Sequence, residues 1–257
     1  MNSLIESFRF LTILPLPGGQ NCTEESINKA GRWFPIAGLL IGLLLGAVSW
    51  GILWLFPVPV AAVLIAFCMI GISGGLHLRG LAATADGFLI STPRERTLEI
   101  MQDSRVSAMG VTAIAFSITL KVVCLASIAP VMIPRAVAIA VLVGRCWLLA
   151  LLVLMPTATD SGLGNMLKKN RTIPEMIFAG CFAVAAAVVI GGLAGAFAVW
   201  ASVIICTAFG VWCMRKISGA TGDTLGAACE ISEMVCLLCF AAKPVNEIII
   251  QTGVSLW

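Results

Sequence analysis

Charged residues are scarce in this sequence. They make up 11% of its 257 residues, whereas a water-soluble globular domain carries about 25%. This scarcity excludes an ordinary soluble domain. Hydrophobic residues make up 60% of the chain, so we predict an all-α, polytopic transmembrane helical bundle in which residues 1–257 form a single integral membrane domain.

Other common features are absent or weak. The N-terminus lacks the basic, apolar and small-residue regions of a removable signal peptide in their usual order. The net charge is only +3 and no basic patch alternates with aromatic residues, so nucleic acid is not an expected partner. Most of the ten cysteines lie in apolar runs, where cysteine behaves as a small hydrophobe. Cys236 and Cys239 form a C-x-x-C pair, but no second pair completes a zinc site, so one turn of a membrane helix is the preferred interpretation.

Long apolar runs predict six to seven membrane spans, because a helix needs about 20 apolar residues to cross ~30 Å of hydrocarbon. Phe56–Pro59 has the prolines of a turn between two helices. The glycine-rich GGLAG at 191–195 is the expected fold point of the uncharged run 176–214. The predicted spans are residues 33–56, 57–76, 106–128, 136–155, 176–191, 196–214 and, as the shortest, 231–242.

The basic residues predict how the chain is oriented. Twelve of the sixteen Lys and Arg residues lie in the N-terminal segment and in three alternate connections, residues 77–105, 156–175 and 215–230. By the positive-inside tendency this face is cytoplasmic, in a bacterial or archaeal inner membrane. Most acidic residues lie on the same face, so we expect polar active-site loops there.

The first polar constellation follows the second predicted span. Asp86 precedes the glycine of the segment TADG. Glu99 and Asp103 in EIMQDSR are four residues apart, as on one face of a helix. With Arg96 and Arg105 nearby, these carboxylates suit Mg²⁺ and a phosphate group. A solvated loop with ion pairs on a helix face is an equally open interpretation.

The second constellation is GATGDTLGAACE at 219–230. Its glycines, with Thr221, Asp223 and Thr224, predict a flexible polar loop that brings backbone N–H groups close to an anion, with Asp223 as a metal ligand or an orienting group. The competing interpretation is a helix start with Asp223 as the N-cap.

Several ionisable residues lie within or beside predicted spans. Lys121 and Arg145 are functional candidates, and we expect Arg145 to pair with a buried acid or a substrate phosphate. Glu230 and Glu233 are expected to face the bundle interior or stay at the interface, because an acid at a span centre costs ~2.5–3.5 kcal/mol. His77, the one histidine, could be a general base or a structural hydrogen-bonding group.

A set of motifs runs in order along the chain from about residue 8 to 240. The motifs are FLTILPLP, GRWFPIAGLLIG, GGLHLRGLAATADG, LEIMQDSR, Lys121, GLGN at 162–165 and TGDTLGAACEISE. Taken together, they resemble the cobalamin synthase family, the adenosylcobinamide-GDP ribazoletransferases.

The resemblance implies a Mg²⁺-dependent inner-membrane enzyme of the last steps of adenosylcobalamin synthesis. A hydroxyl of α-ribazole, or of its 5′-phosphate, would attack the cobinamide-side phosphorus of adenosylcobinamide-GDP and release GMP. Other cobalamin-assembly enzymes are possible partners, and a homo-oligomer stays open. The implied catalytic residues are His77, Asp86, Asp103 and Asp223, the three aspartates being also the implied metal ligands. The implied phosphate- or substrate-binding residues are Arg105, Arg145, Lys121, Thr221, Gly222, Thr224 and Glu230.

The chain departs from the family at two places. The family usually continues the DSR motif with Leu or Ile and then Gly, whereas this chain continues with Val106, Ser107 and Ala108. The other departure bears on the implied metal site. The family pattern HLDGLADTADG has acids at three positions that share one helical face. Here Arg79 and Ala83 occupy the first two positions and Asp86 the third. The loss of two carboxylates is expected to weaken a magnesium site and to lower or abolish activity.

Two functions other than catalysis are also considered. A non-catalytic family member would bind corrinoid intermediates or scaffold a biosynthetic complex without turnover. A small-molecule transporter is disfavoured, because the sequence has no inverted repeat with Gly/Pro-broken spans and its acids gather on one face instead of at the membrane centre.

Overall fold

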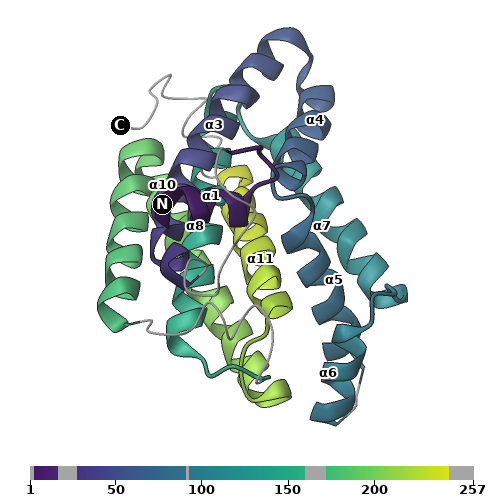
Figure 1. Cartoon of the computed structure of the whole chain (residues 1–257). Coiled ribbons are helices and arrows are strands. Elements are labelled where there is room, and N and C mark those ends of the chain that lie inside the picture. The colour runs from purple at the N-terminus through teal and green to yellow at the C-terminus, as the bar shows by residue number, and fades with distance from the viewer. Residues whose placement is uncertain (1–2, 17–27, 91–92, 160–171, 243–257) are drawn as a thin grey trace.

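The computed structural model describes residues 3–16, 28–90, 93–159 and 172–242. Within these residues the chain is an all-α bundle, as predicted, and the one extended pairing is a single parallel bridge between Thr157 and Ala220. Figure 1 shows the arrangement of the helices. Their bounds are α1 Ser3–Leu11, α3 Phe34–Leu55, α4 Val58–Gly71, α5 Leu76–Phe88, α6 Arg94–Gln102, α7 Ala108–Ser127, α8 Ile133–Leu154, α10 Ile173–Ile217 and α11 Gly222–Ala241, with short 3₁₀ turns at Gly31–Trp33 and Pro130–Met132.

Five helices of the described chain are long and apolar enough to cross a membrane. Helices α4 and α5, which are bent by 84° at a short break, add one further candidate span if they are taken together. The prediction of a second span over 57–76 therefore needs correction, because the helix ends at Gly71. Gly74 and Gly75 then take positive φ angles of 61° and 74° and turn the chain into α5.

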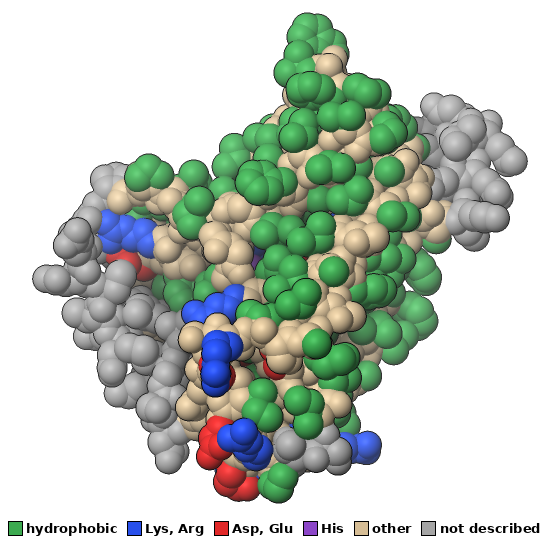
Figure 2. All heavy atoms as spheres, turned by 90° about the vertical axis from the view of Figure 1, so that its right-hand side faces the viewer, with side chains coloured by type: hydrophobic (Ala, Val, Ile, Leu, Met, Phe, Trp, Pro, Cys, Tyr) green, Lys and Arg blue, Asp and Glu red, His purple; other side chains and the backbone are tan. Residues whose placement is uncertain are grey.

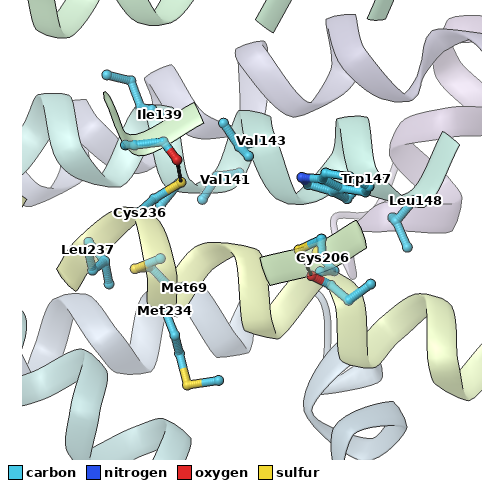
Figure 3. Close-up of a cluster of buried hydrophobic side chains, with 14 of the residues drawn as sticks. Met69, Ile139, Val141, Val143, Trp147, Leu148, Cys206, Met234, Cys236 and Leu237 are labelled. Carbon is cyan, nitrogen blue, oxygen red and sulfur yellow. Dashed lines mark hydrogen bonds between the residues drawn. The ribbon is translucent and has the colours of Figure 1, made fainter. Parts of the chain in front are cut away.

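Helices α8 and α11 form the centre of the bundle. Nearly every residue of α8 is buried, and its apolar side chains pack with those of α10 and α11 in the cluster of Figure 3. Cys206 and Cys236 belong to this cluster, and their thiols face backbone carbonyls of Ala228 and Ala198 at 3.8 and 3.9 Å. The described cysteines are all free, so those in the core act as small apolar residues, as expected.

Helix α3 packs against α8 through a stripe of small residues. Gly38, Gly42 and Gly46 are four residues apart and lie against Arg145, Ala138 and Pro134 of α8 so closely that an added Cβ would collide with them. Small residues at this spacing let two apolar helices approach within a membrane. The side of α3 away from α8 exposes Leu40, Leu43 and Leu44.

Helix α10 is folded in two at the predicted place. Gly192 has φ 57° and ψ −141°, which no helical residue adopts, and the chain reverses there. A Cβ at Gly195 would collide with the carbonyl oxygen of Ala187, eight residues earlier, whereas in a straight helix these residues lie two turns apart. The two arms of α10 explain why one uncharged run supplied two predicted spans.

The charged side chains lie mainly at one end of the bundle. Figure 2 shows Lys, Arg, Asp and Glu mostly in the lower part of the molecule, whereas hydrophobic side chains cover the upper part. The lower end holds α6 and the junction of α10 with α11, and the upper end holds the turn between α3 and α4 (Figure 1). The described connections on either side of α6 and between α10 and α11 therefore lie at one end, as the alternation of the sequence predicts for them.

Candidate active site

A cleft of about 260 Å³ opens where α5, α6 and the beginning of α11 meet. The ends of α1, α3 and α8 complete its walls. Most of its polar lining comes from α5 and the start of α11, with Gln102 and Thr159 in addition, and the rest is mostly apolar. The lining residues are Phe10, Phe34, Leu76, His77, Arg79, Leu98, Met101, Gln102, Leu148, Leu152, Thr159, Thr221, Gly222, Asp223, Leu225 and Gly226.

Helix α5 carries the segment LHLRGLAATADGF. In the sequence analysis, residues 77–105 are a polar connection between spans, whereas this segment is helical from Leu76 to Phe88. Residues 79, 83 and 86 therefore do share one helical face, at spacings of four and three. Of this face, Arg79 lines the cleft.

Asp86 caps a neighbouring helix. Its side chain is 3% exposed and accepts hydrogen bonds from the backbone amides of Ser107 at 2.8 Å and Gly110 at 2.6 Å, and from the Ser107 hydroxyl. These amides belong to the start of α7, where backbone N–H groups have no partner within the helix. Asp86 thus holds the N-terminus of α7 against α5, and it is not among the residues that line the cleft.

Asp103 and Arg105 form an exposed pair outside the cleft. The expectation that Glu99 and Asp103 share a helical face is wrong, because α6 ends at Gln102 and Asp103 has an extended backbone. Three hydrogen bonds run from the Arg105 side chain to the Asp103 carboxylate, at 2.7, 3.1 and 3.2 Å. Hydrogen bonding to Arg105 lowers the pKa of Asp103 to about 2. Arg96 pairs with Glu99 at 2.8 Å, as the alternative of helix-face ion pairs predicts.

The segment 219–230 is a helix start. The expectation of a flexible loop is wrong, since α11 begins at Gly222. Thr221, and not Asp223, is the N-cap: its hydroxyl accepts a hydrogen bond from the Thr224 amide at 3.2 Å, and its own amide donates to the Thr224 hydroxyl at 2.8 Å. Asp223 lies in the first turn at the rim of the cleft.

A glycine contact brings α5 and α11 together at the cleft. A Cβ at Gly80 would lie 2.6 Å from the carbonyl oxygen of Asp223, and a Cβ at Gly226 would lie 3.2 Å from the Cα of His77. Because only glycine leaves room for this approach, His77 and Arg79 on α5 stand beside the first turn of α11.

His77 is a buried residue in the wall of the cleft. Its side chain is 2% exposed, it lines the cleft, and its Nε2 atom has no hydrogen-bond partner among the described residues. A buried polar atom without a partner is costly, so it marks a place where a ligand or a water molecule completes the site.

Comparison with known proteins shows the family of this chain. The sequence model described as cobalamin-5-phosphate synthase matches residues 3–241. The chain belongs to the cobalamin-5-phosphate synthase family. No solved structure matches it.

Its relatives carry the name adenosylcobinamide-GDP ribazoletransferase. The chain is 39% identical to the one from Roseiflexus sp. (strain RS-1) over 232 residues, which cover 90% of this chain and 86% of that relative. It is 34% identical to the one from Clostridium tetani, with 91% and 94% covered, and 34% identical to the one from Brevibacillus brevis, with 93% and 97% covered.

This member of the cobalamin-5-phosphate synthase family has a buried cluster of charges beside the cleft. Lys121 Nζ lies 2.8 Å from Glu230 and 2.6 Å from Glu233, and Arg145 forms an ion pair with Glu233. The Ser117 hydroxyl donates to Glu230 at 3.0 Å. Both acids face the interior, as expected, and Arg145 has the buried acid that one alternative of the sequence analysis required.

Glu233 is the member of this cluster that the sequence analysis did not assign to the site. In the sequence, Glu233 is an acidic residue in an apolar segment. This pattern predicts that its side chain is buried, but it does not predict which side chain pairs with it. Lys121, Arg145 and Glu230 are not among the cleft-lining residues, so direct substrate contact by them stays a prediction. Two nitrogens of Arg145, Nε and NH2, make no hydrogen bond within the described chain.

The described residues do not form a protein-only magnesium site. They contain no group of three His, Cys, Asp or Glu side chains placed to hold a metal ion. Asp86 caps α7, Asp103 binds Arg105, and Asp223 is the one carboxylate in the cleft lining. The motif GLGN at 162–165 lies outside the described residues.

Proposed function

We propose that this protein transfers the phosphocobinamide moiety of adenosylcobinamide-GDP to α-ribazole or its 5′-phosphate and releases GMP. The observation that carries the proposal is the near full-length similarity to relatives of that name, combined with a cleft that places His77, Arg79 and the start of α11 together. The reacting diphosphate fits this polar part, and the apolar lining suits the less polar parts of two large substrates.

The reaction has simple requirements of the protein. The ribazole hydroxyl oxygen forms a bond to the cobinamide-side phosphorus, the bond from that phosphorus to the GMP oxygen breaks, and the hydroxyl proton leaves. Such a transfer needs the two reactants held in line and the phosphate charge stabilised. Arg79 and the first-turn amides of α11 are the groups of the cleft that stabilise negative charge, and His77 Nε2 is placed to take part in the hydrogen bonding of the attacking hydroxyl.

Magnesium enters the proposal only together with substrate. Mg²⁺ in phosphate chemistry is commonly bound through one or two carboxylates plus substrate phosphate oxygens. Asp223 is the carboxylate that the cleft offers for this purpose. The ion would supply charge neutralisation at the leaving GMP.

The position of the cleft also suggests a cellular location. Its α6 wall lies at the end of the bundle where the charged residues gather (Figures 1 and 2), the end that the positive-inside tendency assigns to the cytoplasm. We therefore place the protein in the cytoplasmic membrane of a bacterium or archaeon, with the cleft reached from the cytoplasm, where a nucleotide-bearing substrate is made.

The test is a release assay. Full-length protein in lipid nanodiscs is mixed with adenosylcobinamide-GDP and α-ribazole, with and without Mg²⁺, and GMP is quantified. We expect GMP release that is slow, because Arg79 and Ala83 stand at family acid positions, and that falls by about 10²-fold or more in His77→Ala. Corrinoid binding without any GMP release would contradict the enzyme and favour a binding role.

A further inference from the structure

Arg79 lines the cleft and forms no ion pair with any residue that the structure describes. Its side chain is exposed and makes no hydrogen bond with the described residues. Asp223, on the facing helix, is close enough to interact with it electrostatically. A guanidinium carries five donors in a fork that matches phosphate oxygens, so an unpaired one in a cleft is suited to a phosphoryl group.

The facing wall of the cleft is the N-terminus of a long helix. Helix α11 has 20 residues, and Gly222 and Asp223 of its first turn line the cleft. The Thr221 cap serves the amide of Thr224, which leaves the amides of the first two residues free of intrahelical partners. The helix dipole adds partial positive charge at this point, which favours an anion.

His77 provides independent support for a ligand. Its Nε2 atom is buried, has no partner in the described chain, and lies in the lining of the same cleft. A phosphate oxygen or hydroxyl that enters the cleft would give this nitrogen its missing hydrogen bond. Arg79 and His77 are two residues apart on α5, and the Gly80–Asp223 contact holds both beside α11.

We propose that the cleft binds a phosphoryl group directly through Arg79, the first turn of α11 and His77, and that this binding does not require a metal ion on Asp223. The inference rests on the proposed function for the identity of the natural ligand, a diphosphate-bearing substrate. Within the described residues, Asp86 is occupied by the α7 amides and no three-ligand metal cluster exists, so the positive charge for binding comes from the protein.

Asp223 makes the proposal sharply testable. If the anion is held by Arg79 and the helix start, the carboxylate of Asp223 repels it, and removing that charge strengthens binding. If the anion is instead held through a metal on Asp223, removing the carboxylate weakens binding. The Asp223→Asn variant therefore separates the two arrangements by the sign of its effect.

The experiment measures binding of inorganic pyrophosphate by calorimetry. Full-length protein in phosphatidylcholine nanodiscs, a net-neutral lipid, is titrated in EDTA. We expect binding by the parent protein, about tenfold or greater weakening in Arg79→Ala, and a smaller loss in Arg79→Lys, which keeps the charge but not the fork. Asp223→Asn should bind more tightly.

The matched control is Arg96→Ala, since Arg96 is an exposed arginine that pairs with Glu99 outside the cleft. It should bind like the parent. Binding that requires Mg²⁺, an Arg79→Ala variant that binds like the parent, or weaker binding by Asp223→Asn would each overturn the inference. The outcome is independent of turnover: pyrophosphate binding without GMP release would refute the proposed function alone.

Discussion

Asp86 shows how one carboxylate can join two helices. Family resemblance implied a metal ligand, whereas the structure gives its oxygens three donors at the start of α7. The three donors come from a segment more than twenty residues away. Its burial and its partners therefore assign it a structural task in this chain, whatever further task it has with substrate bound.

We predict that Asp86→Ala lowers the free energy of unfolding by about 1–3 kcal/mol, because two α7 amides lose their acceptor. Asp86→Asn keeps one acceptor oxygen and should lose less. Thermal unfolding in detergent with EDTA measures both. If the variants are less stable than the parent protein in Mg²⁺ but equally stable in EDTA, Asp86 is instead a metal ligand.

The buried charges give a second prediction at the scale of single residues. Lys121→Met leaves Glu230 without its cation and removes one of the two cations that pair with Glu233. This change should lower the free energy of unfolding by about 3–5 kcal/mol. The double variant Lys121→Met/Glu230→Gln restores neutrality, because Arg145 still balances Glu233, and should recover part of the loss. Equal stability of the single and double variants, measured by thermal unfolding, would argue against a charge-balanced cluster.

At the scale of elements, Arg94 attaches α6 to the rest of the molecule. Its guanidinium donates to the carbonyl of Ile217 at 3.0 Å and to that of Ala158 at 2.7 Å. The Ala158 amide donates to the Ala220 carbonyl at 2.9 Å, beside the Thr157–Ala220 bridge that precedes Thr221. One side chain thus links the α6 wall of the cleft to the segments that carry Thr159 and the α11 cap.

We predict that Arg94→Ala loosens α6 without unfolding the bundle, because the helix loses its two long-range hydrogen bonds. Amide hydrogen exchange in residues 98–102 should quicken about tenfold or more, since bonds to charged groups contribute about 1.5–3 kcal/mol, while α7 stays unchanged. Arg94→Lys reaches one carbonyl and should show an intermediate rate. The control is Arg96→Ala on the same helix, and an equal change in that variant would refute a specific attachment.

The whole molecule has one polar end and a largely apolar remainder (Figure 2). The turn between α3 and α4 and the connection after α5 should therefore lie on opposite sides of the membrane. We predict that an epitope inserted at Pro57 is reached by antibody from outside spheroplasts, whereas one inserted at Ile90 is reached only in inverted vesicles. Labelling of both epitopes from one side would contradict this topology.

The sequence alone determined the features that depend on local chemistry. Apolar runs predicted a helical membrane bundle, and GGLAG predicted the reversal at Gly192, because helix formation and glycine turns are decided within a few residues. The motifs also predicted the family. Burial of Glu230 and Glu233 followed from their place in an apolar segment.

Only the tertiary structure decided which polar groups meet. Asp86 could serve a metal or a helix start, and Arg145 a phosphate or an acid. The choice depended on segments 21 and 88 residues away. Periodicity places a side chain on a face of its helix, but the neighbour on that face comes from packing, such as the Gly80 contact that sets Arg79 beside the start of α11. The cleft is formed by such contacts between helices far apart in the sequence, and no local sequence pattern predicts these contacts.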